Sequence, residues 1–104
     1  MVIKTNDNQR YATNSVTGFL LRQMAALAKA PVQEFVVRND CPCGTTIGPI
    51  IAAKTGIRTV DVGVPSLSMH SIRETVGVQD VLTSKQLFEA FFAEFRALDD
   101  ACGF

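Results

Sequence analysis

The sequence predicts an α/β fold built around a largely parallel sheet. Segments typical of strands alternate with segments typical of helices along the chain. Nearly half of the 104 residues (47%) are apolar, which is enough to form a hydrophobic core. The length fits one domain, so we expect residues 1–104 to contain no internal boundary.

The first third of the chain supplies two expected strands with a helix between them. The strands are Val2–Lys4 and Phe35–Val37, both rich in residues that favour β structure. The helix begins after Thr13 or Asn14 as N-cap, and Pro31 ends it or lies just beyond its end. Its apolar face comprises Val16, Phe19, Leu20, Met24 and Leu27.

A second helix and a third strand follow a loop that is dense in turn residues. Pro49 suits the first turn of this helix, which continues to Lys54, and Gly56 suits its C-terminal cap. The third strand is expected at Arg58–Val64. Three strands make a thin sheet with edges to cover, so the unit is expected to be part of a larger sheet.

Two further helix starts are predicted in the last third of the chain. Ser71–Glu74 has the form of a capping box, which predicts a helix that begins just after His70. The last helix is expected from about Asp80 to Leu98. Its apolar stripe comprises Phe88, Phe91, Phe92, Phe95 and Leu98.

Composition argues against several classes of function. The 10 basic and 10 acidic residues balance and form no basic patch, which argues against a nucleic-acid or anionic-membrane partner. No apolar run approaches the roughly 18 residues of a membrane span. The 3 cysteines are unevenly placed, as expected for reduced thiols in an intracellular protein.

His70 is the only histidine and therefore the only imidazole available for catalysis or metal binding. It follows the third expected strand, and ligand sites in open α/β sheets gather at the carboxyl ends of strands. A neutral imidazole is a good zinc ligand. The alternative is a surface or half-buried histidine that makes ordinary hydrogen bonds, since no second metal-ligand motif accompanies it.

Three other groups could carry chemistry. Backbone N–H groups in the loop Gly44–Pro49 could face a negative charge or a polarised carbonyl, although a tight strand-to-helix turn explains the same residues. The Lys4 ammonium could select an acidic ligand, and the Tyr11 hydroxyl could stabilise an oxyanion. The alternative is a solvated lysine and a half-buried tyrosine.

The cysteines offer a different metal hypothesis. Cys41, Cys43 and Cys102 could join His70 as ligands of a structural zinc. The Cys-x-Cys spacing is tighter than that of most zinc sites, so buried thiols are the alternative.

Several strings of residues resemble one known family. Asn8–Asn14, Val37–Asp40, Pro42–Pro49 and Met69–Glu74 are similar, in this order and at similar spacing, to the C-terminal part of the aspartyl aminopeptidases. The resemblance covers nearly the whole chain. Cys41 departs from it, because the family commonly has threonine at this position.

The resemblance implies a metallo-aminopeptidase with a pair of zinc ions that removes N-terminal aspartate or glutamate from peptides. It implies a three-layer α/β/α sandwich of the zinc-aminopeptidase type, of which this chain would be the C-terminal portion of a mostly parallel sheet. Family members assemble as homo-oligomers, namely dodecamers. They occur in the cytoplasm and in the fungal vacuole, and we expect the cytoplasm here.

The resemblance also assigns roles to individual residues. His70 falls on the family's last metal ligand, Lys4 on its acid-selecting lysine and Tyr11 on its pocket tyrosine, which would contact the oxyanion. The backbone from Gly44 through Thr46 to Gly48 would line the substrate pocket.

The family's other metal ligands and its catalytic glutamate would lie upstream of this chain. We therefore expect the isolated chain to be inactive and to bind zinc weakly. The alternative is a non-catalytic assembly or binding module derived from the same fold.

Overall fold

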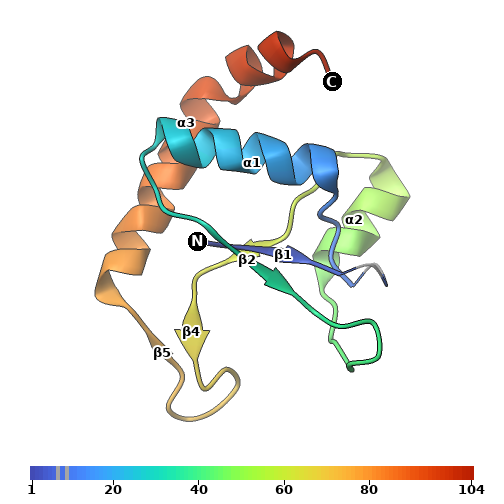
Figure 1. Cartoon of the computed structure of the whole chain (residues 1–104), viewed down its shortest axis with the longest axis vertical. Helices are drawn as coiled ribbons and strands as arrows, with labels where there is room; N and C mark the ends of the chain where they lie inside the picture. The colour runs from blue at the N-terminus through green and yellow to red at the C-terminus, as the bar shows by residue number, and fades with distance from the viewer. Residues whose placement is uncertain (7, 9) are drawn as a thin grey trace.

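The computed structural model describes residues 1–6, 8 and 10–104, which form an α/β arrangement (Figure 1). The alternation of strands and helices predicted from the sequence is confirmed. In chain order the elements are β1 (Val2–Thr5), α1 (Ser15–Leu27), β2 (Gln33–Val36), α2 (Ile47–Thr55), β3 (Val62–Gly63), β4 (Ser66–Leu67), β5 (Thr75–Val76) and α3 (Val78–Cys102).

The main sheet has the strand order β2-β1-β3. β1 pairs with β2 in parallel, in a register that sets Ile3 opposite Glu34. β3 pairs with β1 in the antiparallel direction, with Ile3 opposite Val62. The expectation of a mostly parallel sheet is therefore wrong for the third strand in the described chain.

Hydrogen bonds around Asp61 hold the chain at the point where β3 enters the sheet. Asp61 bonds to Ala12 and Thr13, in the segment that follows β1. These bonds hold the chain at the carboxyl end of β1, so β3 enters the sheet from that end. Of the strand expected over Arg58–Val64, two residues are paired, Val62 and Gly63.

The predicted N-cap of α1 is confirmed. Asn14 Oδ1 accepts from the backbone N–H groups of Val16 and Thr17, both over 3.0 Å, and Thr17 Oγ1 accepts from the Asn14 N–H over 3.1 Å. This reciprocal pattern is a capping box. Of the predicted apolar face, Leu20 and Met24 are buried. Phe19 and Leu27 of that face are exposed.

α2 begins two residues before Pro49 and ends at the predicted glycine cap. Gly56 has a φ of 72°, the left-handed conformation that favours glycine after a helix. The N-cap Thr46 makes no side-chain hydrogen bond to the helix. The N-cap residue therefore leaves the first-turn N–H groups of α2 without a side-chain cap.

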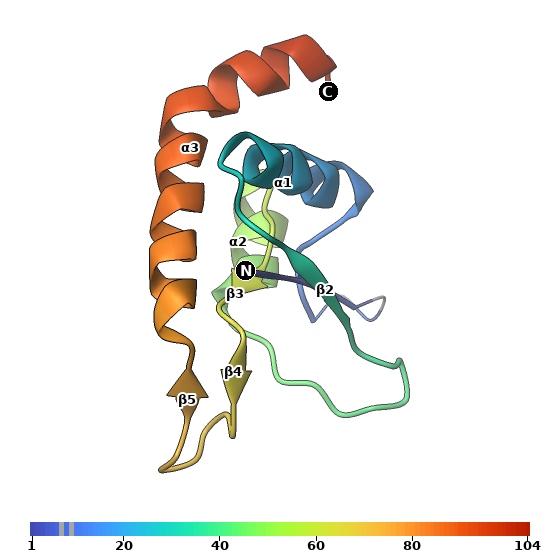
Figure 2. The same cartoon turned by 60° about the vertical axis from the view of Figure 1, so that its left-hand side comes forward.

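The helix predicted just after His70 is absent, because residues 68–74 close a hairpin between β4 and β5 instead. Ser66 pairs with Val76 in this antiparallel hairpin. The Ser71 hydroxyl accepts from the Arg73 N–H over 3.1 Å, rather than capping a helix at residue 74. The last helix, α3, starts after this hairpin (Figure 2).

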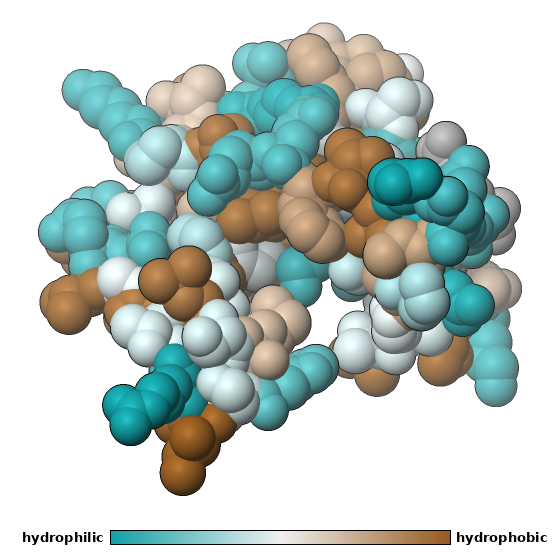
Figure 3. All heavy atoms as spheres, turned by 60° about the horizontal axis from the view of Figure 1, so that its bottom comes forward, coloured by the Kyte–Doolittle hydropathy of each residue, from teal (hydrophilic) through white to brown (hydrophobic). Residues whose placement is uncertain are grey.

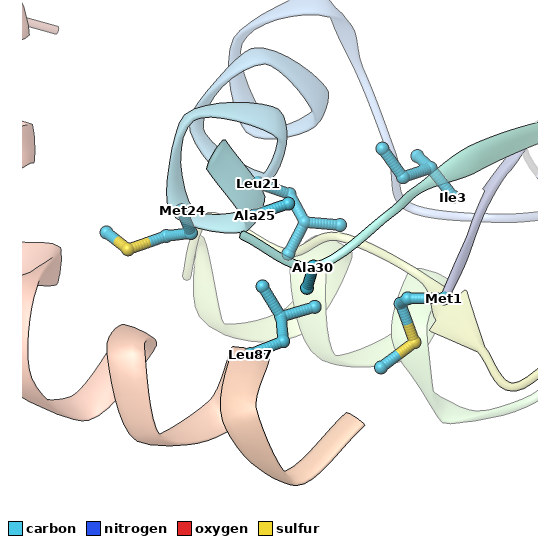
Figure 4. Packing of buried hydrophobic residues seen from close by; sticks show 7 residues of the cluster. All are labelled: Met1, Ile3, Leu21, Met24, Ala25, Ala30 and Leu87. Atoms are coloured by element: carbon cyan, nitrogen blue, oxygen red, sulfur yellow. The ribbon is translucent and has the colours of Figure 1, made fainter. Parts of the chain in front are cut away.

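The core lies where α1, α3 and β1 meet (Figure 4). Leu87 is the α3 residue buried in it, with 1% of its surface exposed, and the predicted aromatic stripe missed it. Phe95 and Leu98 of the stripe do pack against the core. Its other members, Phe88, Phe91 and Phe92, are exposed. The seven core residues are Met1, Ile3, Leu21, Met24, Ala25, Ala30 and Leu87.

A large share of the apolar side chains in the described chain remains exposed. β2 lies at an edge of the sheet, and all four of its residues are exposed, Phe35 and Val36 included. Figure 3 shows hydrophobic side chains scattered among polar ones over one face. Among the described residues, no helix is long and apolar enough to cross a membrane.

Candidate functional site

Lys4 and Tyr11 lie next to each other. Lys4 is in β1, and its Nζ is 5.7 Å from the centroid of the Tyr11 ring. Gly63 leaves room for the lysine side chain, because a Cβ at residue 63 would lie 3.0 Å from Lys4 Cε. None of the ion pairs in the described chain includes Lys4. The half-buried lysine therefore has no acidic partner among these residues.

The Tyr11 hydroxyl is bonded to the loop of residues 37–46. It forms a hydrogen bond with the Cys43 sulfur over 3.5 Å, and close by the Thr45 hydroxyl donates to the carbonyl of Arg10 over 2.8 Å. The hydrogen bond to Cys43, burial, and the charges of Cys43 and Asp61 raise the pKa of Tyr11 to about 12. The phenol is therefore neutral and able to donate a hydrogen bond at ordinary pH.

Asp61 joins the segments that carry Lys4 and Tyr11. Its Oδ2 accepts from the N–H of Ala12 over 2.6 Å, and its carbonyl accepts from the N–H of Lys4 over 2.9 Å. Its own N–H donates to the Thr13 hydroxyl over 2.9 Å. Sequence reasoning missed this residue. Asp61 is a carboxylate inside the strand expected over Arg58–Val64, and a charged group in a strand that packs into a core needs a polar partner. That position is the signal that could have identified it.

The predicted pocket backbone from Gly44 to Gly48 has varied surroundings. Gly44 is exposed, and a Cβ there would meet nothing within 4 Å. Thr46 is the exposed N-cap of α2. Gly48 is buried against Asp61, since a Cβ at residue 48 would lie 2.7 Å from Asp61 Cγ. Packing within the chain thus accounts for the glycine at residue 48, whereas no neighbouring atom requires a glycine at residue 44.

His70 is not part of this group. It lies at the exposed tip of the β4–β5 hairpin with a φ of 65°, in the left-handed region. In Figures 1 and 2 this hairpin extends away from the loop that follows β2. The structure thus brings Lys4 and Tyr11 together with Cys43 and Asp61, and places the predicted zinc ligand elsewhere.

The residues present do not fit a complete zinc centre. In residues 1–6, 8 and 10–104, no three His, Cys, Asp or Glu side chains lie close enough to hold a metal ion. A catalytic zinc normally takes three protein ligands, and a structural zinc takes four. His70 could supply one. The structural zinc formed by Cys41, Cys43, His70 and Cys102 is not supported, because the fold does not gather these residues.

Two cavities lie apart from the predicted site residues. One of about 470 Å³ is apolar and lies between α1, α3 and residues 57–60, with Leu20 and Phe95 in its lining. The other, of about 460 Å³, is lined by Asn6 and by the start of α1. Asn6 is buried. Its Nδ2 donates to the Val37 carbonyl over 3.1 Å, and its Oδ1 has no partner in the described chain.

Comparison with known proteins identifies the family. The family described as "Aminopeptidase I zinc metalloprotease (M18)" matches residues 1–92. The chain belongs to the M18 family. The resemblance recognised in the sequence is therefore confirmed. A "Probable aspartyl aminopeptidase" of Ricinus communis is 64% identical over 99 residues, which is 95% of this M18 chain and 20% of that protein.

Solved structures of relatives share the fold of this M18 chain. A chain of the cryo-EM structure of the Ape4 and Nbr1 complex matches 96% of it with a TM-score of 0.91 and 55% identity. The S. cerevisiae mApe1 dodecamer matches 98% of it with a TM-score of 0.83 and 35% identity. The match covers 19% and 22% of those chains. The M18 chain described here therefore spans about a fifth of the length of its relatives.

Proposed function

We propose that this chain is the C-terminal part of the catalytic domain of a zinc aminopeptidase that removes N-terminal aspartate or glutamate from peptides. The observation that carries the proposal is the pair formed by Lys4 and Tyr11, in which a lysine without an acidic partner in the described chain faces the ring of a protonated phenol. The name of the Ricinus relative supports the same substrate class.

In this proposal Lys4 binds the side-chain carboxylate of the substrate. A hydrogen bond between an ammonium and a carboxylate contributes roughly 1.5–3 kcal/mol. That energy corresponds to a preference of about ten- to a hundred-fold for acidic over neutral substrates. The room left by Gly63 keeps the lysine side chain beside Tyr11, so the selected carboxylate and the reacting carbonyl are held in one region.

Tyr11 acts on the reacting carbonyl. Its hydroxyl donates a hydrogen bond to the oxygen that becomes negative as the tetrahedral intermediate forms. The donor must carry its proton, and a pKa of about 12 keeps Tyr11 protonated at any ordinary working pH. Removal of one such donor typically lowers kcat on the order of a hundred-fold.

The metal centre requires residues from outside this chain. His70 would supply one ligand, and the described residues offer no cluster that completes a site for one zinc ion or for a pair. We therefore propose that the 104-residue chain alone does not turn over peptides. We also place the parent enzyme in the cytoplasm, with the fungal vacuole as alternative. We propose that it forms a homo-oligomer, as its mApe1 relative does.

The test compares acidic and neutral substrates in the complete enzyme that contains this sequence. Lys4→Met should lower kcat/KM for aspartyl and glutamyl substrates by about ten- to a hundred-fold and leave an alanyl substrate nearly unchanged. Lys54→Met, which removes an exposed lysine at the end of α2, is the matched control and should change neither.

Equal losses on acidic and neutral substrates would remove Lys4 from the specificity role. A complete enzyme with no aminopeptidase activity would favour the non-catalytic module instead. Turnover by the purified 104-residue chain would contradict the proposed need for further ligands.

A further inference from the structure

We infer that Asp61 is a positioning residue that fixes the substrate site by holding the backbone beside Tyr11 against the first turn of α2. The inference rests on the proposed function, because it assigns Asp61 a role in the site formed by Lys4 and Tyr11. In this role Asp61 acts through Tyr11 rather than on the substrate.

The first step is the set of hydrogen bonds that Asp61 makes to the segment after Tyr11. The carboxylate accepts from the N–H of Ala12, the residue next to Tyr11, over 2.6 Å. The Asp61 N–H donates to the Thr13 hydroxyl over 2.9 Å. Its carbonyl also accepts from the Lys4 N–H over 2.9 Å. One residue thus fixes the backbone at Lys4 and immediately after Tyr11.

The second step is the approach of the Asp61 carboxylate to α2. A Cβ at Gly48 would overlap this carboxylate, so only glycine fits at residue 48 while Asp61 keeps its place. α2 has no acidic residue in its first turn, and Thr46 provides no side-chain cap. The negative charge of Asp61 therefore lies near the positive end of a helix that has no anion of its own there.

These contacts converge on the Tyr11 hydroxyl. Cys43 lies in the loop that leads into α2, and its thiol bonds to Tyr11. Asp61 is linked to both partners of this bond. It is linked to Tyr11 through the neighbouring residue Ala12, and to the loop of Cys43 through Gly48 in α2. Loss of the Asp61 side chain should let Tyr11 and the loop that carries Cys43 separate. The Tyr11 hydroxyl, which is the proposed oxyanion donor, would then move.

The first test is spectroscopic and needs no catalysis. The chain contains 1 tyrosine and 0 tryptophans, so the ultraviolet absorbance of phenolate reports Tyr11 alone. In the full 104-residue chain, Asp61→Asn removes the charge and keeps an acceptor for the Ala12 N–H, so it should lower the pKa of Tyr11 only slightly. Asp61→Ala also removes the acceptor and should lower the pKa further toward 10, with an unchanged circular dichroism spectrum. Equal shifts in the two variants would mean that only the charge of Asp61 acts on Tyr11 and would overturn the inference. The control Asp40→Asn, which removes an exposed loop carboxylate, should leave it at about 12.

The second test uses the steric relation between Asp61 and Gly48. Gly48→Ala alone should lower the pKa of Tyr11 as Asp61→Ala does, because the new methyl group displaces the carboxylate. Adding Gly48→Ala to Asp61→Ala should cause little further change, because the overlapping carboxylate is already gone. Additive effects of the two substitutions would overturn the inferred coupling.

The third test separates positioning from folding in the complete enzyme. Asp61→Ala should lower kcat on acidic substrates on the order of a hundred-fold with KM little changed, and Asp61→Asn should recover part of the loss. An unchanged Tyr11 pKa or an unchanged kcat would overturn the inference. An inactive wild-type enzyme whose Tyr11 still responds to Asp61 would instead overturn the proposed function.

Discussion

Replacing Cys43 by alanine should lower the pKa of Tyr11 from about 12 toward its ordinary value of 10. The hydrogen bond between the two side chains is the largest cause of the raised pKa, and the charge of Cys43 adds to it. Burial and the charge of Asp61 remain in the variant. The pKa should therefore fall and still lie above that of an exposed tyrosine.

The raised pKa of Tyr11 makes the free energy of unfolding depend on pH. The folded chain holds the Tyr11 proton up to a pH of about 12, whereas the unfolded chain loses it near 10. Between these values the folded state binds more protons, so the free energy of unfolding decreases as the pH rises. The stability that the hydrogen bond to Cys43 contributes is present in full below the unfolded pKa and is lost as the pH rises toward the folded pKa. Cys43→Ala should therefore lower the free energy of unfolding at neutral pH, and the remaining decrease with pH should be smaller and end at a lower pH.

The assay is a spectrophotometric titration of the chain from neutral to strongly alkaline pH, with unfolding monitored in parallel by circular dichroism. Cys41→Ala is the matched control, because it removes an exposed thiol from the same loop. It should leave the pKa of Tyr11 unchanged. A wild-type pKa near 10, or the same pKa in Cys43→Ala as in the wild type, would refute the contact as the cause.

Two further predictions concern the core and the metal. Leu87→Ala should reduce the free energy of unfolding by about 2–5 kcal/mol, whereas Phe92→Ala, at a position that is 83% exposed, should change it by less than about 0.5 kcal/mol in urea titrations. Similar losses in both would mean that α3 does not pack through Leu87. Calorimetric titration of the 104-residue chain with zinc should show no saturable binding in the micromolar range. Tight binding abolished by His70→Asn would show that the chain completes a site by itself.

Local features of the fold could be predicted because their causes lie within a few residues. Asn14 caps α1 through N–H groups two and three residues ahead, and Gly56 ends α2 through its own φ. The capping box expected at Ser71–Glu74 failed for the opposite reason. The same polar residues suit a tight turn, and pairing of β4 with β5 decides between the two structures.

The site was predictable only in part. Lys4 and Tyr11 are close in sequence, and a strand followed by a turn brings them together. Cys43 and Asp61 join them through contacts across 32 and 49 residues, which no local pattern reveals. Asp61 also directly precedes β3, the strand whose antiparallel direction the sequence pattern did not predict. The role of His70 as a zinc ligand stays a prediction.

The open edge of β2 bears on how the isolated chain behaves in concentrated solution. Phe35 and Val36 stand exposed on a strand whose outer backbone groups have no neighbouring strand in the described chain. Such an edge can template strands from other copies and grow toward cross-β aggregates. Dilute, freshly prepared samples are therefore the appropriate material for every titration of the isolated chain.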